Sequence, residues 1–319
     1  MIKVILGKPF LDEAMVELRT LCNLIEVKTG ENFDEVVLQN CDCDVIIAPL
    51  GQKIDGALMK QCNTLKLICS DGVGYDHIDV SEAKKLGIWV THTPGVLSGA
   101  VADLIFTLIL CCARRVVEGL EFMNDGKFKG YDKRLLLGKE LSGATIGIIG
   151  MGRIGEEVVK RAKGFGMNIV YNSRTRKETI EAKWDMKYMD FEELVEKSDV
   201  IVPIMNYSQE VFHLFNERVF GKMKKDAILV NASRGKVIDE EALANHLYNT
   251  PTFYAGLDVY EFEPLVNEKL KGMKNVVCLP HIGSATTQTR YNMAKMNMED
   301  IELIEQGREP KNLVKEFIK

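Results

Sequence analysis

A glycine-rich turn between a strand-like run and a helix-like run constrains this chain more than any other part of its sequence. Gly150, Gly152 and Gly155 follow the apolar run Thr145–Ile149 and open the helical segment Glu156–Lys163. The first glycine of such a turn permits a tight bend, the second lets a pyrophosphate approach the backbone, and the third allows close helix–strand packing. The spacing therefore predicts the first βαβ unit of a dinucleotide-binding domain.

The helix that starts at this turn is expected to contribute to the same site. Its first N–H groups are free and its dipole is positive at that end, so both favour a bound phosphate. We assign Met151, Arg153 and Ile154 to cofactor binding together with the three glycines, because they form the same turn. A glycine-rich turn that binds no ligand is the alternative.

Short runs rich in Val, Ile and Leu alternate with helix-like segments along the chain. The runs are Ile2–Leu6, Val45–Ala48, Leu65–Cys69, Ile88–Val90, Thr145–Ile149, Asn168–Tyr171, Val200–Pro203, Ala227–Val230, Tyr254–Val259 and Val276–Leu279. Strands that alternate with helices form parallel sheets with crossover helices on both faces. Since 319 residues are about twice the size of a typical domain, we predict an α/β protein with two doubly wound parallel-sheet domains.

The domain boundaries follow from the expected topology. Residues 98–124 are apolar along most of their length and are predicted as one long helix, with Ser98 as N-cap and Gly126 past its end. This helix should lead from a domain of residues 1–97 into a domain of residues 98–283, and the helical segment 284–319 should return to the first. Its many-sided apolarity indicates burial between domains or in a homodimer.

Composition excludes several other classes of protein. The chain is 46% hydrophobic and 27% charged, its net charge is −5, and it has no block of basic residues, so nucleic acid is not an expected partner. Eight cysteines without a C-x-x-C pair predict reduced thiols and no metal site. The longest apolar stretch, Leu104–Ala113, is too short to span a membrane, and the N-terminus reads as a strand rather than a signal peptide. We expect a cytoplasmic protein that acts on small molecules.

The segment after the second strand of the dinucleotide unit indicates which cofactor is used. An NAD site usually has Asp or Glu there to bind the ribose 2′-OH, whereas this chain has Asn172-Ser173-Arg174-Thr175-Arg176-Lys177. A hydroxyl and arginines can bind a 2′-phosphate through charge-assisted hydrogen bonds. We predict that Ser173, Arg174 and Thr175 confer preference for NADP(H), with NAD(H) as the second possibility. A solvated basic segment is the alternative.

A cation, a carboxylate and an imidazole follow three successive strands downstream. Arg234 lies in the turn after the strand Ala227–Val230, Glu263 follows Tyr254–Val259, and His281 follows Val276–Leu279. In an open parallel sheet, ligands bind beyond the carboxyl ends of the strands.

The three side chains suit reduction of a 2-keto acid. The guanidinium of Arg234 matches a carboxylate and its neighbouring keto oxygen, and His281, oriented by Glu263, could protonate that oxygen during hydride transfer. Each residue alone would suit a structural role, which we assign to the remaining histidines His77, His92, His213 and His246.

These motifs resemble those of the D-isomer-specific 2-hydroxyacid dehydrogenases over essentially the full chain. The motifs are Gly150–Gly155, Asn231-Ala232-Ser233-Arg234-Gly235, Gly256-Leu257-Asp258-Val259 with Glu263-Pro264, and Pro280-His281-Ile282-Gly283. The resemblance implies a Rossmann cofactor domain and a flavodoxin-like substrate domain with a cleft between them. It also implies that His281 donates the proton, that Glu263 is its partner, and that Arg234 anchors the substrate.

The resemblance extends to further contacts with cofactor and substrate. Asp258, Gly283 and the backbone of Ala232 and Ser233 are expected near the nicotinamide. In the first domain, Gly72-Val73-Gly74 is expected to offer N–H groups to the substrate carboxylate, and Leu50 to line the substrate site.

Within the family the chain is most similar to glyoxylate/hydroxypyruvate reductases. Ser173-Arg174-Thr175 fits their use of NADP(H), and Leu50 lies in a loop that lacks the arginine typical of phosphoglycerate-type members. Such reductases often send a tryptophan from the dimer partner into the substrate site, and Tyr131 stands at the matching position. Two alternatives remain, an NAD-dependent 3-phosphoglycerate dehydrogenase and a nucleotide-sensing binding protein with little turnover. The absence of a regulatory domain after Lys319 weakens the first.

Overall fold

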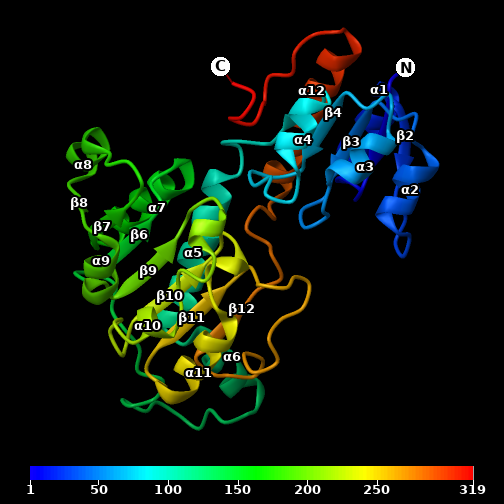
Figure 1. Ribbon diagram of the computed structural model, residues 1–319. Helices are drawn as coiled ribbons and strands as arrows, with labels where there is room; N and C mark the ends of the chain where they lie inside the picture. The colour runs from blue at the N-terminus through cyan, green and yellow to red at the C-terminus, as the bar shows by residue number, and fades with distance from the viewer. Residues whose placement is uncertain (319) are drawn as a thin grey trace. The chain divides into compact units, whose positions relative to one another are not determined.

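The structure is a computed structural model that describes residues 1–318 and divides into two compact units (Figure 1). Unit 1 comprises Met1–Leu97 with Ser284–Lys319, and unit 2 comprises Ser98–Gly283. Each unit is a parallel sheet with helices on both faces, which confirms the predicted fold class. Among the described residues, no helix is long and apolar enough to cross a membrane.

Unit 1 contains a five-stranded sheet in the order β2-β1-β3-β4-β5. Every neighbouring pair of strands is parallel. This is the flavodoxin-like strand order that the resemblance implied. The strands are β1 (Lys3–Leu6), β2 (Asn23–Glu26), β3 (Val45–Ala48), β4 (Leu67–Ser70) and β5 (Trp89–Thr91).

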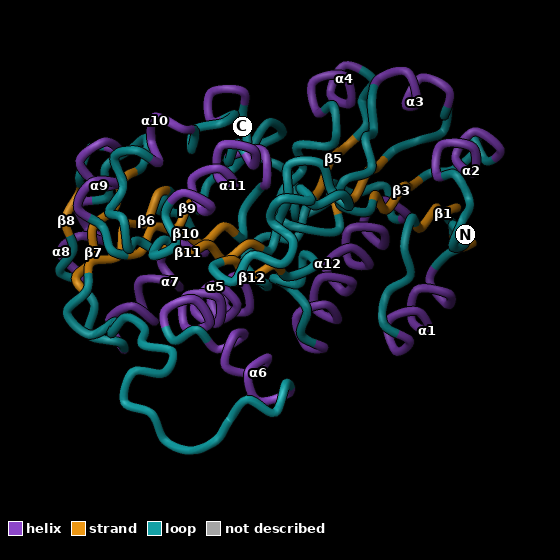
Figure 2. Tube along the Cα trace, turned by 90° about the horizontal axis from the view of Figure 1, so that it is seen from below, coloured by secondary structure: helices purple, strands orange, loops and turns teal. Residues whose placement is uncertain are grey.

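Alternation along the strands of unit 1 divides its core into two layers. Val45 and Ile47 of β3 pack with residues of helices α1 and α12, whereas Ile46 and Ala48 pack with residues of α2, α3 and α4. Figure 2 shows these two groups of helices on opposite sides of the strands of unit 1. The helices are α1 (Asp12–Leu21), α2 (Phe33–Gln39), α3 (Gly56–Gln61), α4 (Val80–Lys85) and α12 (Thr287–Glu305).

Unit 2 contains a seven-stranded parallel sheet in the order β12-β11-β10-β9-β6-β7-β8. Its first strand, β6, lies between β7 and β9, so the strand order reverses at the point where the glycine-rich turn leaves the sheet. This is the Rossmann order with one additional strand, and such a switch point is where dinucleotides bind. The strands are β6 (Thr145–Ile149), β7 (Asn168–Asn172), β8 (Lys187–Tyr188), β9 (Val200–Pro203), β10 (Ile228–Asn231), β11 (Tyr254–Leu257) and β12 (Val276–Cys278).

Helices cover both faces of the sheet of unit 2 (Figure 2). Helices α5 and α7 pack on one face, and α9, α10 and α11 close an apolar core on the other. The helices of unit 2 are α5 (Ser98–Ala113), α6 (Val116–Asn124), α7 (Arg153–Gly164), α8 (Glu178–Trp184), α9 (Phe191–Lys197), α10 (Glu217–Phe220) and α11 (Glu240–Asn249), with short 3-10 turns at Gln209–Val211 and Gly235–Val237.

The prediction of one helix over residues 98–124 is wrong. The backbone of Arg115 takes the left-handed conformation (φ 52°), and the helix ends at Ala113, whose carbonyl accepts a hydrogen bond from Lys139 N–H at 2.7 Å. A separate helix, α6, then begins at Val116. The expected many-sided burial applies to α5 only, because no residue of α6 is buried.

Candidate active site

The three glycines of the turn after β6 differ in what surrounds them. A Cβ atom at Gly150, where φ is +103°, would lie 1.9 Å from the carbonyl oxygen of Ile204, and one at Gly155 would lie 2.6 Å from the carbonyl oxygen of Gly150. A Cβ atom at Gly152 would have no neighbour within 4 Å. Gly150 and Gly155 therefore serve the packing of the turn, whereas the space beside Gly152 is open.

That open space fits a bound pyrophosphate. Gly152 is the N-cap of α7, a helix of 12 residues whose first N–H groups point toward the turn. Met151 is buried beneath the turn, Arg153 is exposed and Ile154 is half-buried in the first helical turn. The residues present thus provide a phosphate-binding cradle without a side chain in it.

No carboxylate side chain stands at the end of β7. Asn172 there donates from Nδ2 to the carbonyl oxygen of Met189 at 2.8 Å, and the Ser173 hydroxyl donates to the carbonyl oxygen of Thr175 at 2.7 Å. Arg174 and Thr175 are exposed. The loop therefore begins with a hydroxyl and a cation, and the carboxylates beside it, Glu178 and Glu181, belong to α8 (Glu178–Trp184).

Arg234 is held by a side-chain-stabilised turn after β10. Asn231 is fully buried; its Oδ1 accepts from the N–H and hydroxyl of Ser233 at 3.0 and 2.9 Å, and its Nδ2 donates to the carbonyl oxygen of Arg234 at 2.9 Å. Ala232 and Ser233 are half-buried. This Asx-type turn sets the backbone that presents Arg234.

Gly235 brings this turn against the segment that carries Glu263. A Cβ atom at Gly235 would lie 1.8 Å from the carbonyl carbon of Tyr260, so the two backbones touch where only glycine fits. The strands β10, β11 and β12 are also in register at their ends, with Asn231 opposite Leu257 and Leu257 opposite Cys278. Parallel pairing thus gathers residues from three strand ends at one edge of the sheet.

At that edge His281 and Glu263 form a hydrogen-bonded pair. Nδ1 of His281 lies 2.8 Å from Oε2 of Glu263, and Oε1 of Glu263 accepts from the N–H of Tyr260 at 3.0 Å. Burial raises the pKa of the Glu263 carboxyl, but the hydrogen bond and charge of His281, the Tyr260 N–H and the charge of Arg234 outweigh it and lower the pKa overall. An ionised carboxylate only accepts, so Nδ1 of His281 carries the proton that is donated to Glu263, and Nε2 is the second ring nitrogen.

Asp258 supports the loop on which His281 stands. His281 has φ +53°, an uncommon conformation for a residue with a side chain. The next two N–H groups, of Ile282 and Gly283, both donate to the carboxylate of Asp258 at 2.8 Å. Asp258 is 1% exposed, and its burial raises its pKa although these N–H groups oppose the shift. The expected cofactor residues Asp258 and Gly283 are therefore bonded to each other.

Three of the expected substrate residues of unit 1, Gly72, Val73 and Gly74, form the loop after β4. The carbonyl oxygens of Gly72, Val73 and Gly74 are bonded to Thr93 N–H, His92 Nδ1 and the Ser70 hydroxyl at 2.9, 2.8 and 2.8 Å. A Cβ atom at Gly72 would lie 2.8 Å from Cδ2 of Leu50, so Leu50 packs on this loop. The three carbonyls are thus all bonded within unit 1, and the N–H of Gly72 also donates within the loop, to the carbonyl oxygen of Ser70 at 2.8 Å.

Tyr131 is in unit 2 and is 87% exposed. It belongs to the segment between α6 and β6, and the structure does not bring it to the other candidate residues of unit 2.

A family model for the "D-isomer specific 2-hydroxyacid dehydrogenase, NAD binding domain" matches residues 106–283. The chain belongs to the D-isomer-specific 2-hydroxyacid dehydrogenase family. It is 45% identical to a glyoxylate reductase of Thermococcus litoralis over 277 residues, covering 86% of this chain and 84% of that protein. It is 42% identical to a glyoxylate reductase of Pyrococcus furiosus over 324 residues, covering 98% and 96%.

Solved structures agree with this assignment. An NADPH-dependent glyoxylate/hydroxypyruvate reductase from Sinorhizobium meliloti, in complex with NADP and malonate, superposes with a TM-score of 0.86 at 28% identity and covers 99% of this chain and 97% of that one. The protein is thus an NAD(P)-dependent D-2-hydroxyacid dehydrogenase, an oxidoreductase that reduces a 2-keto acid with a nicotinamide cofactor.

The sequence prediction did not include two residues that shape this dehydrogenase site. Asn231 builds the Arg234 turn, and Tyr260 holds Glu263 through its N–H and donates from its hydroxyl to the carbonyl oxygen of Leu279 at 2.8 Å. For Asn231 a signal was present, since Asn followed by small residues at a strand end favours an Asx turn. For Tyr260 none was, because its hydroxyl contact with Leu279 joins two segments that are 19 residues apart.

Proposed function

We propose that this dehydrogenase reduces glyoxylate or hydroxypyruvate to glycolate or D-glycerate with NADPH. The observation that carries the proposal is the His281–Glu263 pair, 2.8 Å apart, at the strand edge that also carries Arg234. The names of the curated relatives and of the solved Sinorhizobium meliloti structure support the substrates.

Each residue of the site has a distinct part in the proposed reaction. Nε2 of His281 gives its proton to the keto oxygen, and the Glu263 carboxylate orients the imidazole and stabilises its charged form. Arg234 binds the carboxylate and carbonyl oxygens of the substrate through two parallel N–H groups and stabilises the negative charge that develops. When bound, the nicotinamide supplies hydride to the keto carbon.

Unit 1 is proposed to be the substrate-binding domain and unit 2 the dinucleotide-binding domain. The N–H groups of Val73 and Gly74 would bind the substrate carboxylate, which fits the bonding of the carbonyls of that loop within unit 1. In unit 2, Ala232, Ser233 and Gly283 would lie beside the nicotinamide end, with Asp258 as the support of Gly283.

Preference for NADPH is proposed from the loop after β7. Arg174 is exposed there, and no acid at the end of β7 would repel a 2′-phosphate. The solved Sinorhizobium meliloti relative is named as NADPH-dependent and contains NADP, in agreement with this proposal.

A homodimer is proposed from the apolar surface of α6 and the segment after it. Large apolar side chains are exposed along this stretch by 49 to 66% of their surface: Val116, Leu120, Met123, Phe128 and Leu137. Such a surface on one protomer is typical of a protein interface. Tyr131 in the same stretch would then reach the substrate site of the partner. We expect Leu120→Glu to shift the mass measured by light scattering from dimer to monomer.

A cytoplasmic location is proposed because all eight cysteines carry free thiols. Labelling of the intact protein with a thiol reagent after denaturation, directly from cell lysate, tests this; recovery of disulfides would argue against it.

Cofactor absorbance tests the catalytic proposal. NADPH and NADH are offered separately with glyoxylate, hydroxypyruvate and phosphohydroxypyruvate. Fast NADPH oxidation with the first two supports the reductase. Preference for NADH and phosphohydroxypyruvate would indicate a 3-phosphoglycerate dehydrogenase, and no turnover with any pair would indicate a binding protein.

Two variants test the residue roles. Arg234→Ala should lose most of the turnover and bind substrate weakly, whereas His281→Ala should lose turnover but still bind NADPH. Near-normal turnover of either variant would refute the assignment.

A further inference from the structure

The loop between β7 and α8 is held by a hydrogen-bonded network centred on Glu181. Arg176 donates from Nε and Nη2 to the two carboxylate oxygens of Glu181, both at 2.9 Å. The Tyr171 hydroxyl donates to Oε1 of Glu181 at 2.6 Å and accepts from the N–H of Lys177 at 2.7 Å. Tyr171 is fully buried in β7, so the network ties both ends of the loop to the core of unit 2.

The network extends to the neighbouring strand. The rings of Tyr171 and Tyr188 meet edge to face with centroids 5.5 Å apart, and the guanidinium of Arg176 lies 5.9 Å from the centre of the Tyr188 ring. The hydrogen bonds from Arg176 and Tyr171 lower the pKa of Glu181 to about 2. The carboxylate therefore stays ionised at neutral pH, and Arg176 stays paired.

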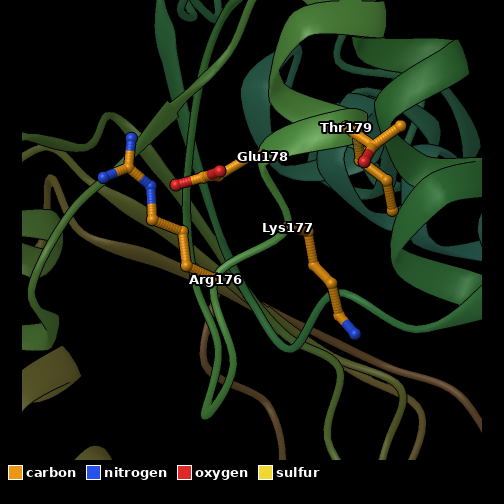
Figure 3. A pocket seen from close by; sticks show the side chains of 5 residues that line it. Arg176, Lys177, Glu178 and Thr179 are labelled. Atoms are coloured by element: carbon orange, nitrogen blue, oxygen red, sulfur yellow. The ribbon is translucent and has the colours of Figure 1, made fainter.

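The two arginines of the loop consequently differ. Arg176 uses two donors on Glu181, and its side chain lies along a surface pocket of about 390 Å³ that Lys177, Glu178, Thr179 and Ile180 also line (Figure 3). Arg174 is exposed, and no side chain among residues 1–318 pairs with it. The hydroxyl proton of Ser173 is already donated to the carbonyl oxygen of Thr175.

We propose that Glu181 is a positioning residue for recognition of the 2′-phosphate, and that Arg176 is its structural clamp rather than a phosphate ligand. The proposal rests on the proposed use of NADP(H). The pre-formed loop presents the Arg174 guanidinium and the Thr175 hydroxyl to the phosphate. Without the clamp, this loop would have to be ordered at the moment of binding, which weakens affinity.

Binding of nucleotide fragments tests the proposal without turnover. Isothermal titration calorimetry on the intact protein compares adenosine 2′,5′-bisphosphate, which carries the 2′-phosphate, with 5′-AMP, which lacks it. We expect Glu181→Gln and Tyr171→Phe to lower the affinity for the bisphosphate roughly three- to tenfold and to leave the affinity for 5′-AMP unchanged. This factor corresponds to the cost of ordering one or two side chains on binding.

Glu178→Gln is the matched control. Glu178 is in the first turn of the same helix and lines the same pocket, and its carboxylate extends to the side of Arg176 (Figure 3). Like Glu181→Gln, the Glu178→Gln substitution removes one negative charge, but it removes no hydrogen bond of the network. If charge alone mattered, both Gln variants would bind the bisphosphate more tightly. The proposal predicts that, of these two variants, only Glu181→Gln binds it more weakly.

Each other outcome is decisive. Tighter binding of the bisphosphate to Glu181→Gln would mean that the freed Arg176 binds the phosphate. Unchanged binding to Glu181→Gln and to Tyr171→Phe would mean that the loop needs no clamp. Either result overturns the proposal. If the unmodified protein does not distinguish the two nucleotides, the proposed NADP(H) preference fails, and this inference with it. Circular dichroism checks folding, and Tyr171→Phe provides the test should Glu181→Gln fail to fold.

Discussion

The turn after β6 allows stability and cofactor binding to be separated with two single-methyl substitutions. Gly150→Ala would place a methyl group 1.9 Å from the carbonyl oxygen of Ile204, about 1.6 Å inside an ordinary contact of about 3.5 Å, at a φ of +103°. The conformational strain alone costs about 1–3 kcal/mol, and with the backbone clash we expect a loss of about 3–5 kcal/mol in the free energy of unfolding of unit 2.

Gly152→Ala should behave in the opposite way. Its φ of −97° is ordinary, and its Cβ would have no neighbour within 4 Å. Since alanine is a poorer N-cap than glycine, we expect a stability loss of about 1 kcal/mol at most. The methyl group would stand where the pyrophosphate approaches and would displace charge-assisted hydrogen bonds worth about 1.5–3 kcal/mol. We therefore expect the affinity for NADPH to fall roughly 10- to 100-fold.

Thermal unfolding and NADPH fluorescence titration measure the two effects on the same samples. A Gly152→Ala variant that melts like the unmodified protein and binds NADPH equally well would refute the claim that the open space beside Gly152 receives the cofactor. A Gly150→Ala variant of normal stability would refute the steric argument.

Three further predictions concern the remaining machinery. Arg234→Lys should raise KM by at least about tenfold because an ammonium cannot form two parallel bonds, and steady-state kinetics with unchanged KM would contradict this. Asp258→Asn should lower kcat about 10- to 100-fold, because Ile282 and Gly283 each bond a different carboxylate oxygen and the amide NH2 that replaces one oxygen cannot accept; normal kcat would show that the loop needs no such anchor. Burial raises the pKa of Asp71 to about 6 against the hydrogen bond from Asn297 and the charge of Arg290, so the protonated form is favoured on folding. Protonation of Asp71 therefore adds to the free energy of unfolding fully below about pH 4, and this contribution is lost as the pH rises through about 6. Asp71→Asn should flatten that part of the stability profile of unit 1 in urea unfolding, and an unchanged slope would refute it.

Local sequence was sufficient wherever one segment determines its own conformation. The ten predicted runs correspond to strands, because most of their side chains are apolar and buried in the parallel sheets. The glycine spacing was equally informative, since positive φ and close approach exclude other residues. The strands β2 and β8 were not predicted, because none of their side chains is buried and neither has an uninterrupted apolar run.

Other features depend on contacts between distant segments. The break at Arg115 coincides with a hydrogen bond from Lys139 N–H to the end of α5, a contact that the pattern of residues 98–124 does not predict. The sequence likewise assigned Arg174 to the 2′-phosphate but left open whether Arg176 shares it, and only the fold shows that Glu181 pairs with Arg176 from α8.

The candidate active site combines both kinds of information. The residue types Arg234, Glu263 and His281, each just after a strand, followed from the sequence together with the rule that ligands bind beyond the carboxyl ends of parallel strands. Which atoms meet was decided by the tertiary structure, through strand register, the backbone contact at Gly235 and the bonds of Asp258 to the loop after His281. The chemistry of a side chain can be read from a single residue. The hydrogen bond of 2.8 Å between His281 and Glu263, in contrast, forms only when two strands and the turns after them are placed together.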